Sequence, residues 1–271
     1  MSAAHRGGPG LVLCVGGLDP SGGAGILADL RGARAAGGRA VAALAALTAQ
    51  NSERVFAVRA VPRGWVRSQI EALAREGPFG AVKAGLLASP GSVSELAAWY
   101  RGAQAGPLVV DPVLIAGDGT RLVQEPTRRA LVRDLIPLAA LVTPNRAEAE
   151  MLSGERITGP RSMERAARRI VSPGGPSAVL LKGGHVPGPP ADLLWDGRRG
   201  RWLRSARRLP GRWHGLGCHL ASMIAVRLAL GDPLPRAVAR ARARLALGMK
   251  GAVATPSGRR VPSWERSRAG R

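Results

Sequence analysis

The feature that most constrains the fold of this chain is the alternation of short apolar runs with segments of helical periodicity. Apolar runs at residues 11–15, 41–47 and 108–113 have the length and composition of buried strands. Helical patterns follow them, for example over residues 126–136 and 218–230. Alternation of this kind through most of the length predicts an α/β fold in which a mainly parallel central sheet carries helices on both faces.

The chain shows no linker-like stretch and no internal repeat, so its 271 residues predict one domain. We expect residues 1–10 to be a disordered lead-in, residues 11–252 to form the domain and residues 253–271 to be a polar, basic tail. The dipeptide Asp196-Gly197, between two short apolar segments, predicts a hairpin. No apolar run reaches membrane-spanning length, and the N-terminus lacks the apolar stretch of a signal peptide. Two cysteines exclude a disulfide framework, and a cytoplasmic location is expected.

The net charge of +22 makes nucleic acid an obvious candidate partner. However, only three of the 40 basic residues are lysines, and the arginines are spread along the chain. Denser runs occur only at residues 198–212 and in the tail from residue 259. No zinc-finger or RNA-recognition signature is present. We therefore expect a solvated basic surface and no specific nucleic-acid partner.

Polar or glycine-rich segments follow the predicted strands, although each of them could be an ordinary connecting loop. They are residues 16–25, 48–51, 83–85 and 182–185, together with Asp111 and Asn145. Because the carboxyl ends of parallel strands meet at one edge of a sheet, these segments should line one crevice.

Residues 214–219, His-Gly-Leu-Gly-Cys-His, lead into the helical pattern of residues 218–230. The free N–H groups and the dipole of a helix N-terminus favour an anion, and glycine lets the backbone approach it closely. A thiol at this place should have a lowered pKa and serve as a base or nucleophile. The alternative interpretation is a glycine-rich cap on a core helix.

Asn145 and Glu148 have a spacing that suits a hydrated Mg²⁺ on a nucleotide, and equally an N-cap with a first-turn acid. His185 and His214 lack metal-ligand spacing. A Cys-His-Asp hydrolase built from Cys218, His214 or His219, and Asp111 is conceivable, but no nucleophile-elbow sequence is present. Several glycine loops with an anion-favouring helix start fit phosphoryl transfer better.

Seven motifs in this order resemble the hydroxymethylpyrimidine/phosphomethylpyrimidine kinases of thiamine biosynthesis, in the ribokinase-like superfamily. The motifs begin at Gly17, Leu47, Lys83, Val109, Thr143, Lys182 and His214. Asp-Pro-Ser-Gly-Gly-Ala-Gly at 19–25, Thr-Ala-Gln-Asn at 48–51 and the cysteine at 218 distinguish this family from sugar kinases. The resemblance implies a ribokinase-like fold and two ATP-dependent steps. These steps convert 4-amino-5-hydroxymethyl-2-methylpyrimidine to its monophosphate and then to its diphosphate.

The resemblance also assigns roles by position. The expected pyrimidine-binding residues are Gly17, Asp29, Gln50, Leu86 and Val113. Cys218 would be the base, and the amides around Gly215 and Gly217 would hold the transferring phosphoryl group. The expected ATP and Mg²⁺ side comprises Asp111, Asn145, Glu148, Lys182 and Gly183, with His185 nearby. Mg²⁺ is expected with ATP and not in a direct protein cage. Dimers are common in the family, so a homodimer is possible.

The sequence departs from the family pattern around the phosphates. Leu216 and His219 replace two threonines, and residues 116–119 read Ala-Gly-Asp-Gly where Ala-Lys-Ser-Gly is usual. Leu18 and Leu27 also differ, and the C-terminal Gly-His-Gly-Pro segment is missing. One lost charge-assisted phosphate contact costs about 1.5–3 kcal/mol, enough to weaken the second phosphorylation. A kinase for pyridoxal-type alcohols and a weakened pseudokinase that only binds pyrimidine or nucleotide are the alternatives.

Overall fold

The computed structural model describes residues 10–183, 191–204 and 210–264. In this part of the chain a nine-stranded sheet has the order β3-β2-β1-β4-β5-β6-β7-β8-β9. Its strands are β1 (Leu11–Leu18), β2 (Arg39–Gln50), β3 (Val55–Ala60), β4 (Ala81–Ala84), β5 (Leu108–Val110), β6 (Leu141–Val142), β7 (Val179–Leu181), β8 (Ala191–Trp195) and β9 (Gly200–Arg204). The six strands from β2 to β7 in this order are parallel, and the antiparallel pairs lie at the two edges. The predicted mainly parallel sheet is confirmed.

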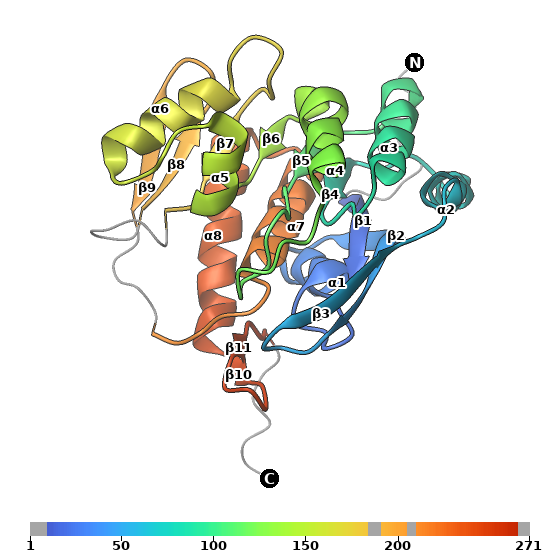
Figure 1. The fold of residues 1–271 in the computed structure, drawn as a ribbon, viewed down its shortest axis with the longest axis horizontal. Helices are drawn as coiled ribbons and strands as arrows, with labels where there is room; N and C mark the ends of the chain where they lie inside the picture. Colours follow the sequence, from blue (N-terminus) through green and yellow to red (C-terminus); the bar gives the residue numbers. More distant parts are fainter. Residues whose placement is uncertain (1–9, 184–190, 205–209, 265–271) are drawn as a thin grey trace.

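Helices cover both faces of the sheet (Figure 1). One face carries α1 (Gly25–Ala35), α7 (Leu216–Ala229) and α8 (Leu234–Lys250). The other carries α2 (Trp65–Ala74), α3 (Pro90–Gly102), α4 (Glu125–Ala130), α5 (Arg146–Ser153) and α6 (Pro160–Ile170). Side chains alternate between these faces along each strand. Thus Leu13 and Val15 pack under α2 and α3, while Val12 and Cys14 pack under α7 and α8.

One helix differs from the expected pattern. The helix predicted for residues 126–136 is α-helical only to Ala130, and it continues as a π-turn (Leu131–Leu135) and a 3₁₀-turn (Ile136–Leu138). Pro137, in the 3₁₀-turn, has no N–H to continue the α-helical ladder. The predicted hairpin at Asp196-Gly197 is confirmed, because β8 and β9 pair antiparallel across it.

The expected polar tail contains ordered structure up to residue 264. Val253–Ala254 (β10) and Arg260–Val261 (β11) form a two-stranded antiparallel sheet. Figure 1 shows this C-terminal hairpin next to the end of the long loop that follows β5. Our domain boundary at residue 252 stays a prediction, while the hairpin itself packs on the domain.

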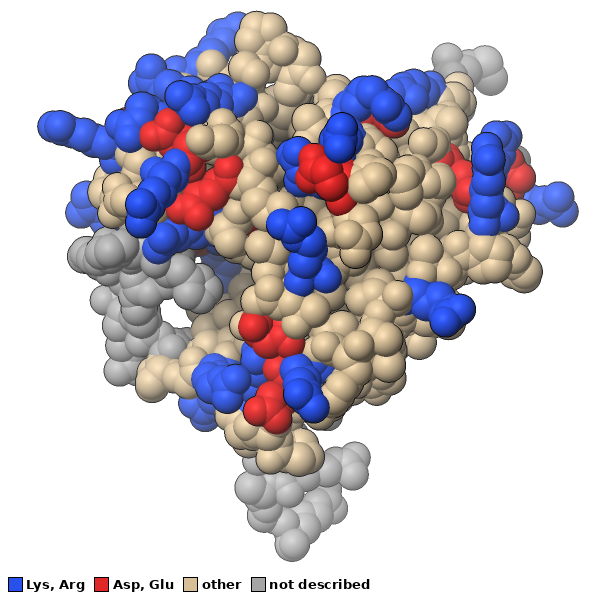
Figure 2. All heavy atoms as spheres, viewed as in Figure 1, with Lys and Arg blue, Asp and Glu red and all other residues tan. Residues whose placement is uncertain are grey.

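The described surface carries basic side chains in scattered groups interspersed with acidic ones on the face that Figure 2 shows. No single basic stripe runs across this face. Among residues 10–183, 191–204 and 210–264, none of the helices combines the length and the apolar character needed to cross a membrane.

Candidate active site

The N-terminus of α7 lies at the carboxyl edge of the parallel strands, where the predicted loops converge. Gly215 is the N-cap of α7 and has a left-handed backbone (φ +75°). A Cβ at Gly215 would collide with the carbonyl oxygen of Gly23. A Cβ at Gly217 would lie 3.1 Å from Lys182 Nζ and 3.2 Å from Asp111 Oδ2. These glycines therefore let the glycine-rich loop of residues 19–25 and a charged pair both approach the helix start closely.

Asp111 and Lys182 form the ion pair that faces this helix start. Lys182 Nζ donates to Asp111 Oδ1 at 3.0 Å, and the Thr143 hydroxyl donates to the same oxygen at 2.9 Å. Burial by itself would raise the pKa of Asp111, but Lys182, Lys83 and the Thr143 hydrogen bond together lower it below its ordinary value. The Asp111 carboxylate therefore stays charged and holds the Lys182 ammonium beside Gly217.

Asn145 and Glu148 form a complete capping box at the start of α5. The Asn145 side chain accepts from Glu148 N at 3.0 Å, and Glu148 Oε2 accepts from Asn145 N at 2.8 Å. Burial raises the pKa of Glu148 to about 7, an effect that Lys182 opposes and Asp111 reinforces. The capping alternative from the sequence is thus realised, and a nucleotide role for these two residues remains a prediction.

Asp29 and Lys83 form a second ion pair, between α1 and β4. Lys83 Nζ lies 2.8 Å from Asp29 Oδ2, and the two side chains are 1% and 0% exposed. Asp29 Oδ1 has no hydrogen-bond partner in the described part of the chain. Burial raises the pKa of Asp29 to about 6, although the charge of Lys83 opposes this. Asp29 is therefore buried and ion-paired with Lys83, so contact with a pyrimidine would require its side chain to rearrange.

Cys218, in the first turn of α7, corrects one expectation. We expected the helix start to lower the pKa of this thiol, but burial raises it to about 12. Lys83 lowers it, while Asp29 and Asp111 raise it again. The prediction of a lowered pKa was wrong because loss of water around the thiol outweighs the helix dipole.

Asp19 joins the glycine-rich loop of residues 19–25 to the segment before α7. Its Oδ2 lies 2.7 Å from His214 Nε2 and accepts from Ala24 N at 2.8 Å, and its Oδ1 accepts from Ser21 N and Oγ. Burial alone would raise the pKa of Asp19, but hydrogen bonding with His214, Ser21 and Gln50 lowers it well below its ordinary value. An ionised Asp19 therefore fixes His214, and with it the loop that carries Gly215.

Gly17 and Leu86, two of the predicted pyrimidine-binding residues, lie in contact distance. A Cβ at Gly17 would lie 3.0 Å from Leu86 Cδ2. Gln50 ends β2 and is close enough to Asp19 to affect its pKa, while Val113 follows Asp111 after β5 and is half-buried. All four residues lie near the carboxyl end of a strand of the sheet, and their pyrimidine-binding role, which the resemblance implies, remains a prediction.

Gly183, predicted on the nucleotide side, has a backbone amide that already donates to Asp192 Oδ1 at 3.0 Å. A Cβ at this position would collide with the carbonyl oxygen of Ala191, so only glycine fits. Its amide is therefore hydrogen-bonded to Asp192 of β8, and the nucleotide role of Gly183 remains a prediction. His185 lies outside the described residues.

His219, where the family usually has threonine, is hydrogen-bonded to the backbone of the helix start. Its Nδ1 lies 2.8 Å from Gly215 O, and its ring is 5.3 Å from the Trp264 ring. Its Nε2 has no hydrogen-bond partner in the described part of the chain, and burial lowers its pKa to about 4. The imidazole is therefore neutral at pH 7 and cannot replace a threonine hydroxyl at the phosphates. Leu216 packs partly buried against the core under α7.

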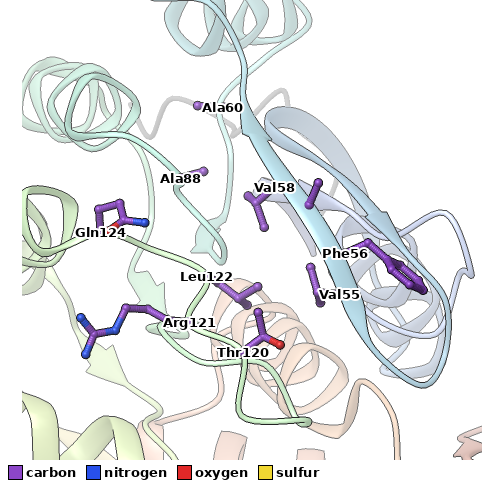
Figure 3. A pocket seen from close by; sticks show the side chains of 10 residues that line it. Val55, Phe56, Val58, Ala60, Ala88, Thr120, Arg121, Leu122 and Gln124 are labelled. Atoms are coloured by element: carbon purple, nitrogen blue, oxygen red, sulfur yellow. The ribbon is translucent and has the colours of Figure 1, made fainter.

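A cavity of about 260 Å³ lies between β3 and the segment that follows the loop after β5 (Figure 3). Its lining includes Val55, Val58, Ala88, Leu122 and Gln124. None of the predicted site residues lines it. Since it contains none of the residues that converge at the start of α7, we do not assign it as the active site.

Comparison with known proteins decides the family. A family model described as phosphomethylpyrimidine kinase matches residues 19–260, which is most of the chain. The chain belongs to the phosphomethylpyrimidine kinase family. The resemblance seen in the motifs is thereby confirmed, and with it the ribokinase-like α/β fold and a phosphotransferase activity.

Two curated relatives show how much of a kinase the chain spans. It is 41% identical over 251 residues to the thiamine biosynthesis bifunctional protein ThiED of Geobacter sulfurreducens. This alignment covers 92% of the present chain but only 51% of that protein. It is 39% identical to the hydroxymethylpyrimidine/phosphomethylpyrimidine kinase of Streptomyces coelicolor, covering 86% of each chain. The chain thus spans about half of the bifunctional relative and most of the single kinase.

A solved structure of pyridoxal kinase from Staphylococcus aureus, in complex with AMP-PCP and pyridoxal, has a TM-score of 0.82 to this kinase. The two chains are 28% identical, and the alignment covers 93% of this chain and 92% of that one. The fold is therefore shared with a pyridoxal kinase.

Three contributors to the site had no individual role in our kinase assignment, although residues 83–85 were expected to line the crevice and motifs begin at Thr143 and His214. Lys83 pairs with Asp29, Thr143 binds Asp111 and His214 binds Asp19. Of the three lysines, Lys83 lies in β4 and Lys182 directly follows β7. The pairings themselves join residues 54, 32 and 195 positions apart, and no local pattern reveals them.

Proposed function

We propose that this kinase phosphorylates 4-amino-5-hydroxymethyl-2-methylpyrimidine and then its monophosphate with ATP. The observation that carries the proposal is the start of α7, where Gly217 lies against Lys182 and Asp111 and is followed directly by Cys218. Free amides, a fixed cation and a thiol are thereby joined at one point. Such an arrangement suits phosphoryl transfer, in which positioning and charge stabilisation do most of the work.

The residues have separate tasks in this proposal. The amides of residues 215–218 bind the transferring phosphoryl group, and Lys182 neutralises charge that accumulates on it. Asp111, held by Thr143, keeps Lys182 in place. Gly17, Gln50, Leu86 and Val113 line the pyrimidine side, where the Gln50 amide can both donate to and accept from an aminopyrimidine edge.

The residues of the site fit ATP with Mg²⁺. No group of three metal-ligating side chains occurs in the described ranges, and the buried carboxylates are engaged with Lys182 and with backbone amides. ATP would supply the γ-phosphoryl group with Mg²⁺ on its phosphates. Asp111 and Glu148 are the acids near enough to Lys182 to influence its pKa, so they would hold the hydrated cation.

Cys218 is our candidate base. Because its pKa is about 12 in the ligand-free protein, the thiol is neutral at pH 7 and must lose its proton before it can accept the substrate's. The buried Lys83 is the group whose positive charge favours the thiolate. We therefore propose that turnover depends on a small thiolate fraction that grows with pH.

The test is ADP release with the pyrimidine alcohol, its monophosphate and pyridoxal as acceptors. Turnover of the first two is expected, and turnover of pyridoxal alone would replace the pyrimidine assignment by that of the related kinase. ATP binding without turnover of any acceptor would instead indicate a pseudokinase.

Cys218→Ala should lower kcat about 10²–10⁴-fold, the usual contribution of a positioned base. In the wild type log kcat should rise with pH between 7 and 9, since the thiolate fraction rises until the pKa is reached. In Cys218→Ala that slope should vanish. Full activity of Cys218→Ala, or a flat wild-type profile, would refute the base assignment without affecting the fold.

A cytoplasmic homodimer is a further part of the proposal. Leu47 and Phe56 are 47% and 57% exposed on the β2–β3 pair at one edge of the sheet, which suits a contact between copies. Both cysteines are free thiols, as in proteins of a reducing compartment. Light scattering on the purified protein should give twice the mass of the 28.1 kDa chain.

A further inference from the structure

Arg259, in the C-terminal hairpin, is a buried cation that has no counter-ion among the described residues. The residue is only 5% exposed. Nη2 donates to the carbonyl oxygen of Glu53 at 2.9 Å, and Nε has no hydrogen-bond partner within the described ranges. None of the ion pairs formed there includes Arg259. A buried charge is costly unless it is paired, so this guanidinium is suited to receive an anion.

The other end of the guanidinium faces the loop of residues 116–119. A Cβ on Gly117 would lie 3.2 Å from Arg259 Nη1, which is tight. Asp118, the acid of this loop, is engaged elsewhere, because Oδ2 accepts from Val55 N and Oδ1 from Thr120 N. Gly117 itself is exposed. The guanidinium therefore reaches the loop at the position where the family usually places a lysine.

The hairpin also joins Arg259 to the anion-binding helix start. The next residue, Arg260, accepts at its carbonyl oxygen from His214 N at 3.0 Å and donates from its own N to Arg212 O at 2.8 Å. Trp213 and Arg260 form a parallel β-bridge. Arg259 is thus one residue away from the backbone that precedes Gly215–Cys218, where the free amides favour an anion.

We propose that Arg259 binds a phosphate group at the active site, and that it supplies the cation that loop 116–119 lacks in this chain. The proposal rests on the phosphoryl-transfer function proposed above. The phosphate belongs either to the nucleotide or to the phosphorylated pyrimidine. A guanidinium whose Nη1 lies at the loop can donate a charge-assisted hydrogen bond to a phosphate oxygen there.

A purely structural role makes different predictions. Arg259 also holds the turn after β2 in place through its hydrogen bond to Glu53 O. A second contact joins this turn to the hairpin, between Ser52 Oγ and Ser257 Oγ at 2.8 Å. If that were its whole task, Arg259→Gln would lower the melting temperature and leave phosphate affinity unchanged in the folded protein. Phosphate affinity and stability are therefore measured side by side.

The experiment compares Arg259→Gln with Arg259→Lys and with Arg260→Gln. Arg260 is the matched control, because it lies next to Arg259 and carries the same charge, but is exposed. Calorimetry measures the affinity for ATP and for pyrophosphate, and kinetics give KM for ATP and for the pyrimidine monophosphate. We expect Arg259→Gln to weaken phosphate binding about 10- to 100-fold, Arg259→Lys to retain part of it and Arg260→Gln to change it less than threefold.

Two comparisons make the result decisive. A rise in KM confined to ATP assigns the nucleotide phosphate, and a rise confined to the monophosphate assigns the phosphorylated pyrimidine.

In Arg259→Gln, the second change Gly117→Lys should restore affinity, because the loop of residues 116–119 then supplies a cation at the same place. Unchanged phosphate affinity in folded Arg259→Gln, or no rescue by Gly117→Lys, would overturn the proposal. Pyrophosphate binding is measured without turnover, so it tests Arg259 even if the pyrimidine assignment fails.

Discussion

Two lysines lie near the start of α7, and they differ in how far their side chains are buried. Lys83 and Asp29 are 1% and 0% exposed, whereas Lys182 and Asp111 are 19% and 4% exposed. Both pairs have short contacts, 2.8 Å and 3.0 Å. Only Lys182 lies beside Gly217 at the rim of the crevice. We call Lys182 and Asp111 the open pair and Lys83 and Asp29 the sealed pair. In the proposed reaction, the ammonium of the open pair can turn to an incoming phosphate, while the sealed pair acts only through its charge.

The environments of the two carboxylates differ in the same way. Among the described residues Asp29 is bound by Lys83 alone and Oδ1 has no partner, and burial raises its pKa to about 6. Asp111 is also buried, but it has Lys182 and Thr143 on one oxygen, and its pKa is lowered. The charges of Lys182 and Lys83 and the hydrogen bond from Thr143 therefore keep Asp111 ionised, whereas Asp29 is near its protonation midpoint in mildly acidic solution.

Breaking the sealed pair should have the largest effect. Lys83→Met leaves Asp29 buried and unpaired, which typically costs about 3–5 kcal/mol of unfolding free energy. Urea denaturation of the variant measures this loss. The double change Lys83→Met with Asp29→Leu should recover most of the stability, because two apolar side chains then replace the pair. A stable single variant would show that the pair is not needed for folding.

Breaking the open pair should affect catalysis more than folding. Lys182→Met removes a charge-assisted phosphate contact, so kcat/KM should fall by about 1.5–3 kcal/mol in transition-state terms, roughly 10- to 100-fold. The unfolding free energy should change less than in Lys83→Met, because Asp111 keeps the Thr143 hydrogen bond. An activity loss matched by an equal loss of stability would remove the distinction between the two pairs.

The smallest effect is a difference of sign in the pH dependence of stability. The pKa of Asp29 is raised from 3.8 to about 6, so its contribution is full below pH 4 and is lost as pH rises toward 6. The pKa of Asp111 is lowered, so its contribution is present above pH 4 and is lost as pH falls further. Relative to Asp29→Asn, the wild type should gain stability on acidification from pH 6. Relative to Asp111→Asn, it should lose stability below pH 4.

Urea titrations at fixed pH values between 3 and 7 measure both difference curves. Each slope is limited to about 1.4 kcal/mol per pH unit, the maximum for one titrating group. Parallel curves for the two variants would mean that the carboxylates have similar environments after all.

Much of the crevice followed from the sequence, because its residues come directly after buried strands. Asp111, Lys182 and Gly217 were predicted separately, and the parallel order of β5, β6 and β7 brings them together. The partner of Asp29 was not predicted, since its ion pair spans 54 positions. The pKa of Cys218 was predicted with the wrong sign, because desolvation depends on everything packed around the thiol and not on the helix start alone.

The sequence alone determined the α/β class, the strand ends that carry polar residues, the glycine-rich helix start and the family. These properties depend on local periodicity and on motifs that are contiguous in the chain. Only the tertiary structure decided which lysine is sealed, that Asp19 holds His214, and that part of the expected tail returns to the site. Arg259 meets Glu53 across 206 positions. Such a contact exists only after the chain has folded, because burial and pairing are properties of the packed molecule.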